Sequence, residues 1–188
     1  DWNNRNRVKT PQGPVWLSVP VKRKGYLEKK ICDIEINNDV KWRHKHWNTL
    51  LHNYGKAPHF SNYAEYFEDV YSRQWKTLTE LNESMLAWFL SELGINAPII
   101  SAGDLDLQGA KSDLVLDMCK KLDADIYIFG EQGRGYADEA TFEAAGIKPL
   151  FQDYRHPVYA QQQGDFISHL SIVDLLFNCG GDSPDILM

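Results

Sequence analysis

Hydrophobic and polar residues alternate in two segments near the beginning of the chain. Residues 15–21 alternate and are rich in β-branched side chains, and residues 31–36 alternate again before the turn residues Asn37, Asn38 and Asp39. A period of two bounded by turn residues is typical of half-buried strands. The pattern therefore predicts an N-terminal pair of strands.

Apolar residues three and four positions apart mark the middle of the chain as helical. The pattern covers residues 41–54, 62–73 and 79–93. Pro58 separates the first two segments, and Gly94 stands where a glycine commonly ends a helix. Three consecutive helices are expected here.

Short apolar runs and helical patterns alternate in the second half of the chain. The expected elements are a strand at 98–101, a helix at 110–122, a strand at 125–129, a helix at 138–145, a strand at 148–152 and a helix at 168–178. Strand–helix–strand spacing favours parallel pairing. We expect an α/β fold: a mostly parallel sheet with flanking helices, preceded by the strand pair and the helical middle segment, in a single domain spanning residues 1–188.

Eight apolar side chains are predicted to be largely buried in one α/β core, around a central strand at 125–129. They are Trp16, Leu17, Ile34, Ile126, Ile128, Leu170, Leu175 and Phe177.

Composition narrows the class of protein. The 188 residues suffice for one domain with a core, and 43% hydrophobic and 12% aromatic residues indicate a folded globule. The formal net charge of -6 provides no general basic footprint, so no nucleic-acid partner is expected. No apolar run is long enough to predict a membrane span.

Cysteine and histidine spacing indicates neither disulfides nor a metal. Cys32, Cys119 and Cys179 are odd in number and far apart, which fits a reducing cytosol and predicts a cytoplasmic protein. His44, His46 and His52 lack a metal-binding spacing, so no metal is predicted. No secretory signal is visible, although the sequence starts at Asp1 and not at Met.

Asp174 is the unusual residue of the last predicted helix, where it shares a face with Leu170, Ser171 and Phe177. A carboxylate among apolar side chains is expensive to bury unless a cation or several hydrogen bonds meet it. We expect Asp174 to be substantially buried and hydrogen-bonded to residues 155–161 or to the helix that carries His46. It is then either a structural clamp or part of a site.

Two histidines are candidates for acid/base chemistry. His46 shares a helical face with Asn53, and imidazole titrates near neutrality. The alternative is a basic amphipathic helix with aromatic anchors. His156 precedes Pro157, which restricts it to an extended conformation, and with Asp153 or Asp174 it would form a base with an orienting carboxylate.

The segment after His156 would hold Tyr159 and Gln161 in fixed directions. The alternative is a tightly packed crossover loop whose polar groups cap backbone.

Two segments are candidates for anion binding. Gly130, Gly133 and Arg134 follow the strand at 125–129, where backbone N–H groups and a guanidinium can meet a phosphate. The alternative is a flexible turn that needs positive φ. Arg5 and Arg7 stand among asparagines in the first seven residues, which suits an anion, although a solvated arm is the alternative.

The chain resembles the WbqC-like protein family, a bacterial family found among surface polysaccharide (O-antigen) gene clusters. The stretches that carry the resemblance are 4–9, 16–21, Trp42, His46, 53–54, 56–58, Phe60, 81–82, 93–95, Tyr127, Gly130, Tyr136, Phe142, 146–147, Tyr154, 156–157, 159–161, 166–167 and 170–180. Members usually begin with a His-Gln-Pro segment followed by a strand, and we expect the chain to start after both.

The resemblance implies an enzyme of surface polysaccharide biosynthesis. It would transfer an amino acid or acyl group to a nucleotide-linked amino sugar, and its small-molecule substrate would be a sugar nucleotide. Catalytic residues would be His46, His156 and Asp174. Substrate-binding residues would be Arg5, Arg7, Asn53, Tyr54, Gly130, Gly133, Arg134, Tyr136, Tyr159, Gln161 and Ser171.

Other classes of function stay open beside the transferase. One is a nucleotide-sugar-binding module, or a nucleotidyltransferase-like protein by analogy of fold alone. Another is a non-catalytic interaction subunit of a polysaccharide assembly complex. The residues point to no particular cofactor or oligomeric state.

Overall fold

The computed structural model of the chain describes residues 2–25 and 28–188, with the backbone alone for Trp2. It divides into two compact units. The first unit comprises Asp1–Asn96 and His156–Met188, and the second comprises Ala97–Arg155. That the chain folds as a single domain stays a prediction.

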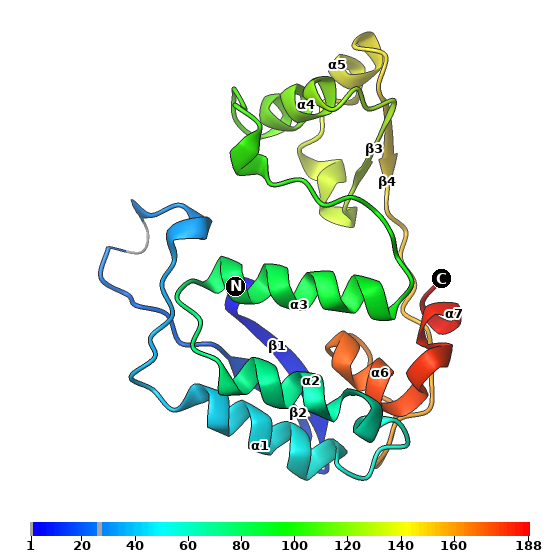
Figure 1. The fold of residues 1–188 in the computed structure, drawn as a ribbon. Coiled ribbons are helices and arrows are strands. Elements are labelled where there is room, and N and C mark those ends of the chain that lie inside the picture. Colours follow the sequence, from blue (N-terminus) through cyan, green and yellow to red (C-terminus); the bar gives the residue numbers. More distant parts are fainter. Residues whose placement is uncertain (1, 26–27) are drawn as a thin grey trace. The chain divides into compact units, whose positions relative to one another are not determined.

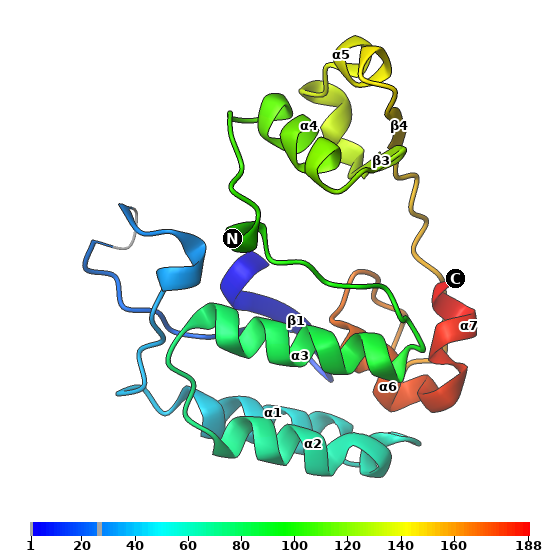
Figure 2. The ribbon, with the colours of Figure 1, turned by 45° about the horizontal axis from the view of Figure 1, so that its top comes forward.

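The first unit joins the N-terminal β-hairpin to the three middle helices and to the helices at the C-terminal end. Its elements are η1 (Trp2–Asn4), β1 (Arg5–Thr10), β2 (Gly13–Ser18), η3 (Ile31–Asp33), α1 (Trp42–Tyr54), α2 (Phe60–Ser72), α3 (Leu78–Glu92), α6 (Ile172–Cys179), η6 (Gly180–Asp182) and α7 (Ser183–Leu187). In both ribbon views α1 and α2 run side by side (Figures 1 and 2).

The N-terminal strand pair exists, but its partners differ from the prediction. β1 and β2 are antiparallel, with Arg7 opposite Trp16 and Val8 opposite Val15. A solvated arm was the alternative for the first seven residues, but Arg5, Asn6 and Arg7 belong to strand β1. The predicted strand at 31–36 is wrong: it begins as the 3-10 helix η3 and ends in isolated bridges. A short turn brings β1 beside β2, and such local pairing closes readily.

The three middle helices are confirmed. α3 begins with a capping box, in which the Thr77 side chain accepts from the backbone N–H of Glu80 and the Glu80 side chain accepts from that of Thr77. Gly94 follows α3 with φ +65°, as expected for a glycine after a helix.

The core of the first unit forms where α6 meets the hairpin and the middle helices. Phe177 is fully buried, and its ring lies 5.0 Å from that of Phe60 and 5.3 Å from those of Tyr54 and Phe67. α6 starts later than predicted, because Ser171 is its N-cap and His169 has φ +58°.

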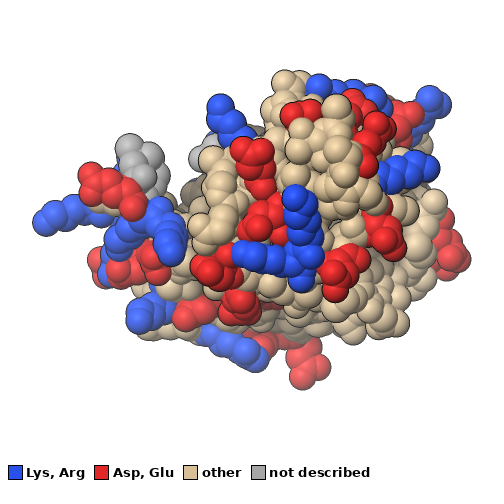
Figure 3. Space-filling view, turned by 90° about the horizontal axis from the view of Figure 1, so that it is seen from above, with Lys and Arg blue, Asp and Glu red and all other residues tan. Residues whose placement is uncertain are grey.

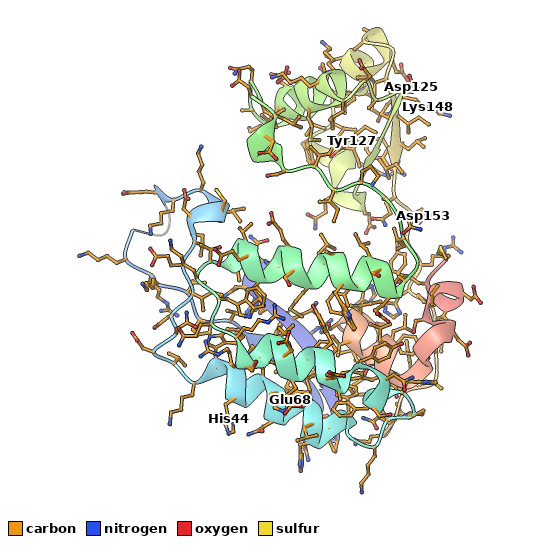
Figure 4. All side chains as sticks on the ribbon, in the orientation of Figure 1. His44, Glu68, Asp125, Tyr127, Lys148 and Asp153 are labelled. Carbon is orange, nitrogen blue, oxygen red and sulfur yellow. The ribbon has the colours of Figure 1, made fainter. Side chains whose placement is uncertain are left out.

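The second unit is a small layer of helices on a two-stranded sheet. Its elements are η4 (Ala102–Asp104), α4 (Ser112–Lys121), β3 (Ile126–Phe129), η5 (Glu131–Gly135), α5 (Glu139–Ala144) and β4 (Lys148–Phe151). β3 and β4 are parallel, and the Lys148 N–H donates to the Asp125 carbonyl at 2.8 Å, at the ends labelled in Figure 4.

The sheet differs from the predicted one. The described residues form a mixed α/β protein with two separate strand pairs, one antiparallel and one parallel, and no large parallel sheet. Residues 98–101 are not a strand, and Ile99 and Ile100 are exposed. So short an apolar run does not distinguish a strand from a connecting segment.

The predicted core list is partly wrong. Leu175 and Phe177 are buried as expected, and Leu17, Ile34 and Leu170 are half-buried. The exposed members are Trp16, Ile126 and Ile128. A parallel strand is apolar on both faces when helices cover both. In β3 only the face of Phe129 is covered, by Phe142 among others.

The two faces of β3 predict opposite responses to truncation. Phe129→Ala should destabilise the second unit by about 3–5 kcal/mol, because Phe129 is 1% exposed. Ile128→Ala should change its stability by less than about 0.5 kcal/mol, because Ile128 is 63% exposed. Amide hydrogen exchange within residues 97–155 measures both, and equal losses of protection would contradict the assigned faces.

Candidate functional site

Asp174 lies at the centre of the first unit with no exposed surface. Its Oδ1 accepts a hydrogen bond from the Tyr54 hydroxyl at 2.7 Å, and its Oδ2 accepts one from the Tyr159 hydroxyl at 2.9 Å. Tyr54 belongs to the helix of His46, and Tyr159 to the segment 155–161. The prediction of a buried, bonded Asp174 is therefore confirmed.

The hydrogen bonds continue from Tyr54 and Tyr159 into β1 and the loop before α6. The Tyr54 oxygen accepts from the backbone N–H of Lys9 at 2.7 Å. Lys9 is 3% exposed, and its ammonium group donates to Gln161 Oε1 at 3.1 Å and to the Asp165 carbonyl at 2.7 Å. We call Lys9, Tyr54, Tyr159, Gln161 and Asp174 the Asp174 cluster.

Burial sets the protonation of the Asp174 cluster. Desolvation raises the pKa of Asp174, although the tyrosine hydrogen bonds and the charge of Lys9 oppose that shift. Burial, followed by the neighbouring carboxylate, raises the pKa of Tyr54 and of Tyr159, so both hydroxyls keep their protons and donate. A carboxylate enclosed in this way has the geometry of a clamp.

His46 is buried in α1 and neutral. Its Nε2 lies 3.1 Å from the Ser18 carbonyl, so this nitrogen carries the hydrogen. Burial lowers the pKa of His46 to about 4. The expected pairing with Asn53 does not form: the Asn53 side chain donates to the Thr49 carbonyl at 2.7 Å, and the His46 ring bonds to Ser18.

The loop before α6 gathers His156 and a second histidine. The His156 Nδ1 lies 2.8 Å from the Pro157 carbonyl, and its ring centroid lies 4.8 Å from that of His169. Arg7 donates through Nη2 to the His169 carbonyl at 3.0 Å. Two candidate residues from opposite ends of the chain, Arg7 and His156, thus adjoin the same loop.

The glycine segment of the second unit, residues 130–135, is closely packed at Gly133 and exposed at its other positions. Gly133 is buried, and a Cβ there would lie 2.6 Å from Phe129 Cβ, which is a packing reason for glycine. Gly130 has φ -61°, so positive φ does not explain it. Arg134 is exposed with its guanidinium 4.6 Å from the Phe151 ring centroid, and Tyr136 is also exposed.

Two cavities adjoin the hairpin of the first unit. The cationic cavity has a volume of about 1240 Å³ and is lined by Arg5, Lys22, Arg23 and Lys29, among others. The apolar cavity has a volume of about 430 Å³ and is lined mainly by hydrophobic side chains of the hairpin, α1, α3 and α6. Both are lined by Asn3, Asn4, Arg5 and Val19, so they are contiguous.

Three predicted site residues meet at the apolar cavity: Arg5, His46 and Ser171. Ser171 also has a structural role there, because its backbone N–H donates to the Arg7 carbonyl at 2.8 Å and its Oγ caps α6. The cavity therefore forms where β1 meets the start of α6.

Sequence reasoning missed the cations at 22, 23 and 29. The signal that could have identified them is the cluster of basic residues on both sides of Gly25. This gathering is local: Lys and Arg mix with Asp and Glu over the face seen in Figure 3.

A third cavity of about 410 Å³ lies between α1 and α2 and is lined by His44 and Glu68, both labelled in Figure 4. Across residues 2–25 and 28–188, no three His, Cys, Asp or Glu side chains are placed to hold a metal ion. No helix in this part of the chain has the length and apolarity needed to cross a membrane.

Comparison with known proteins identifies the family. The model of the WbqC-like protein family matches residues 1–186, and the chain belongs to this family. It is 36% identical over 189 residues to "Uncharacterized protein Rv1507c" of Mycobacterium tuberculosis, a match that covers 100% of this chain and 81% of the relative. No solved structure matches the chain.

Removing the Asp174 carboxylate should destabilise the first unit. Asp174→Ala leaves two buried hydroxyls without their acceptor, at about 1–3 kcal/mol each. Asp174→Asn keeps one acceptor and should cost less. Urea unfolding measures both, and an unchanged stability of Asp174→Ala would contradict the clamp.

Because the pKa of Asp174 is raised, the difference in stability between Asp174→Asn and the wild type should depend on pH. In the folded chain the pKa of Asp174 lies above its ordinary value of 3.8. The protonated side chain therefore contributes to the stability of the fold below pH 3.8, and this contribution is lost as pH rises through the folded pKa. Asp174→Asn cannot ionise. The stability of Asp174→Asn relative to the wild type should therefore improve as pH rises from 3.8 through the folded pKa of Asp174.

His46 predicts a loss of stability in acid. Its pKa falls from 6.5 to about 4 on folding, so the unfolded chain takes up the proton first and stability drops as pH falls through this window, by up to about 3 kcal/mol. His46→Gln can still donate to Ser18 and should flatten the loss between pH 7 and pH 4. The exposed His44→Gln is the matched control, and equal slopes in the two variants would contradict a buried neutral His46.

Proposed function

We propose that the chain is an enzyme of bacterial surface polysaccharide assembly that binds a nucleotide-linked amino sugar and transfers an amino acid or acyl group to it. Membership of the WbqC-like family supports the setting. The observation that carries the binding step is the cationic cavity, which adjoins an apolar cavity at Arg5.

The cationic cavity suits a diphosphate. Guanidinium and ammonium groups form charge-assisted hydrogen bonds with phosphate oxygens. Lys22 and Lys29 pair with Glu35 at 2.7 and 3.3 Å, with substantial solvent exposure. Exposed pairs of this kind contribute little to stability, so both lysines can turn to a phosphate at low cost.

His46 supports the transfer step. In that step the sugar amine attacks the carbonyl carbon of an activated acyl donor, the new C–N bond forms, the bond to the leaving group breaks, and the amine proton passes to the leaving group or to water. His46, with a pKa of about 4, is too weak a base to keep that proton, and its role is to orient the amine through a hydrogen bond. With its hydrogen on Nε2, the neutral His46 ring has an unprotonated Nδ1 that accepts hydrogen bonds. The ring lines the apolar cavity beside Arg5.

A binding module without turnover is the second candidate. The Asp174 cluster favours it, because the carboxylate that was expected to orient a catalytic histidine is held by Tyr54 and Tyr159. Both candidates bind a sugar nucleotide, and only the enzyme releases an acylated sugar. Product formation with an activated acyl donor therefore separates them.

Calorimetric titration with a UDP-linked amino sugar tests the proposed site. Arg5→Ala should weaken binding by at least tenfold, since a hydrogen bond to a charged group contributes about 1.5–3 kcal/mol. Arg134→Ala is the matched control, because Arg134 is the anion-binding candidate of the second unit. Binding that is lost in Arg134→Ala and kept in Arg5→Ala would move the phosphate site to the glycine segment. No binding to the wild type would contradict the proposal.

A further inference from the structure

The apolar cavity differs in chemistry from the cationic cavity beside it. Hydrophobic side chains of the hairpin, α1, α3 and α6 provide most of its lining, among them Leu17, Leu50, Leu81, Met85 and Phe89. Its volume of about 430 Å³ lies within the range of small-molecule pockets. Such a lining binds hydrocarbon well.

We propose that the apolar cavity holds the hydrocarbon chain of a ligand whose phosphate-bearing head lies in the cationic cavity. This inference rests on the phosphate-binding step of the proposed function and changes what else is bound. Either the transferred group is a long-chain acyl group and not an amino acid such as glycine, or the acceptor sugar is carried by a lipid phosphate in place of a nucleotide.

The charges around the apolar cavity argue against an amino acid. A free amino acid brings an ammonium group, which is costly to remove from water without a carboxylate partner. Among the described residues the cavity is lined by no Asp or Glu. The one Lys or Arg in its lining is Arg5, whose guanidinium lies 4.4 Å from the centroid of the Trp16 ring. A hydrocarbon chain makes no such demand.

The position of Arg5 fixes the direction of the ligand. Arg5, Asn3 and Asn4 line both cavities, and they form the polar boundary between them. The head of an amphiphile placed there meets Arg5 and then the lysines of the cationic cavity. Its chain extends past His46 towards Met85 and Phe89 of α3.

A chain-length series of alkyl phosphates tests the inference. Inorganic phosphate and the butyl, hexyl, octyl and decyl phosphates are titrated below their micelle concentrations. Each methylene that enters the cavity should tighten binding about three- to fourfold until the cavity is full. An affinity independent of chain length would overturn the inference.

Leu86 provides a variant with a matched control. It lines the apolar cavity and is 46% exposed, so Leu86→Asp should fold and weaken octyl phosphate at least tenfold. Leu51 is 47% exposed, lies on α1 and is absent from the lining of the cavity, so Leu51→Asp should bind like the wild type. Leu86→Gln, which adds no charge, should be intermediate, and equal affinities in all three would overturn the inference. Melting temperatures show whether each variant is folded.

Two further probes separate the sources of such a chain. Lauroyl-coenzyme A is compared with coenzyme A, and farnesyl phosphate with inorganic phosphate. The inference is supported if the hydrocarbon chain tightens binding in either pair and Leu86→Asp removes that increase in affinity. An increase in the first pair indicates a thioester donor, and an increase in the second indicates a lipid-linked acceptor. No increase in either pair overturns the inference. The sugar-nucleotide titration is independent of these probes, so a failure of the inference can be told apart from a failure of the proposed function.

Discussion

The Asp174 carboxylate, held between two tyrosine hydroxyls, is the interaction on which the rest of the first unit depends. Tyr54 is 120 positions away in sequence and Tyr159 is 15 positions away, so one side chain joins α1, α6 and the loop before α6. Tyr54 also accepts from the Lys9 backbone, which adds β1. A buried polar network of this kind is satisfied in one arrangement only, and it fixes the register of the elements around it.

The two cavities follow from that arrangement. β1 carries Arg5 at its first residue, and the backbone of Ser171 bonds to that of Arg7. The start of α6 is thereby attached to the hairpin, and the apolar cavity lies where they meet. In the proposed function Asp174 therefore has a structural role: it holds the elements that form the walls of the cavity. A net charge of -6 coexists with a cationic cavity because charge is gathered locally.

The sequence allowed the local elements and the clamp to be predicted, but not the pairing of strands. The middle helices have strong periodicity and clear ends at Thr77 and Gly94, which are properties of the nearby chain. Asp174 was recognisable because a carboxylate in an apolar segment must have a partner. Which partner it has depends on tertiary contacts across more than a hundred residues, and the sequence suggested a histidine as readily as a tyrosine.

The errors have the same physical origin. β3 is apolar on both faces, a pattern that usually means cover on both, yet Ile126 and Ile128 are exposed. Which face of a strand is buried depends on what packs against the whole sheet, so the sequence of a single strand does not reveal it. The cations at 22, 23 and 29 escaped notice because a basic connecting segment looks the same whether it lines a cavity or lies in solvent.

The most direct test of the account is to map the amide resonances of the chain during titration with a UDP-linked amino sugar. The account predicts that the largest shifts occur at Asn3, Asn4 and Arg5 and at residues 18, 19 and 21–23, which line the cationic cavity. Shifts confined to residues 130–136, or no shift at saturating ligand, would contradict it.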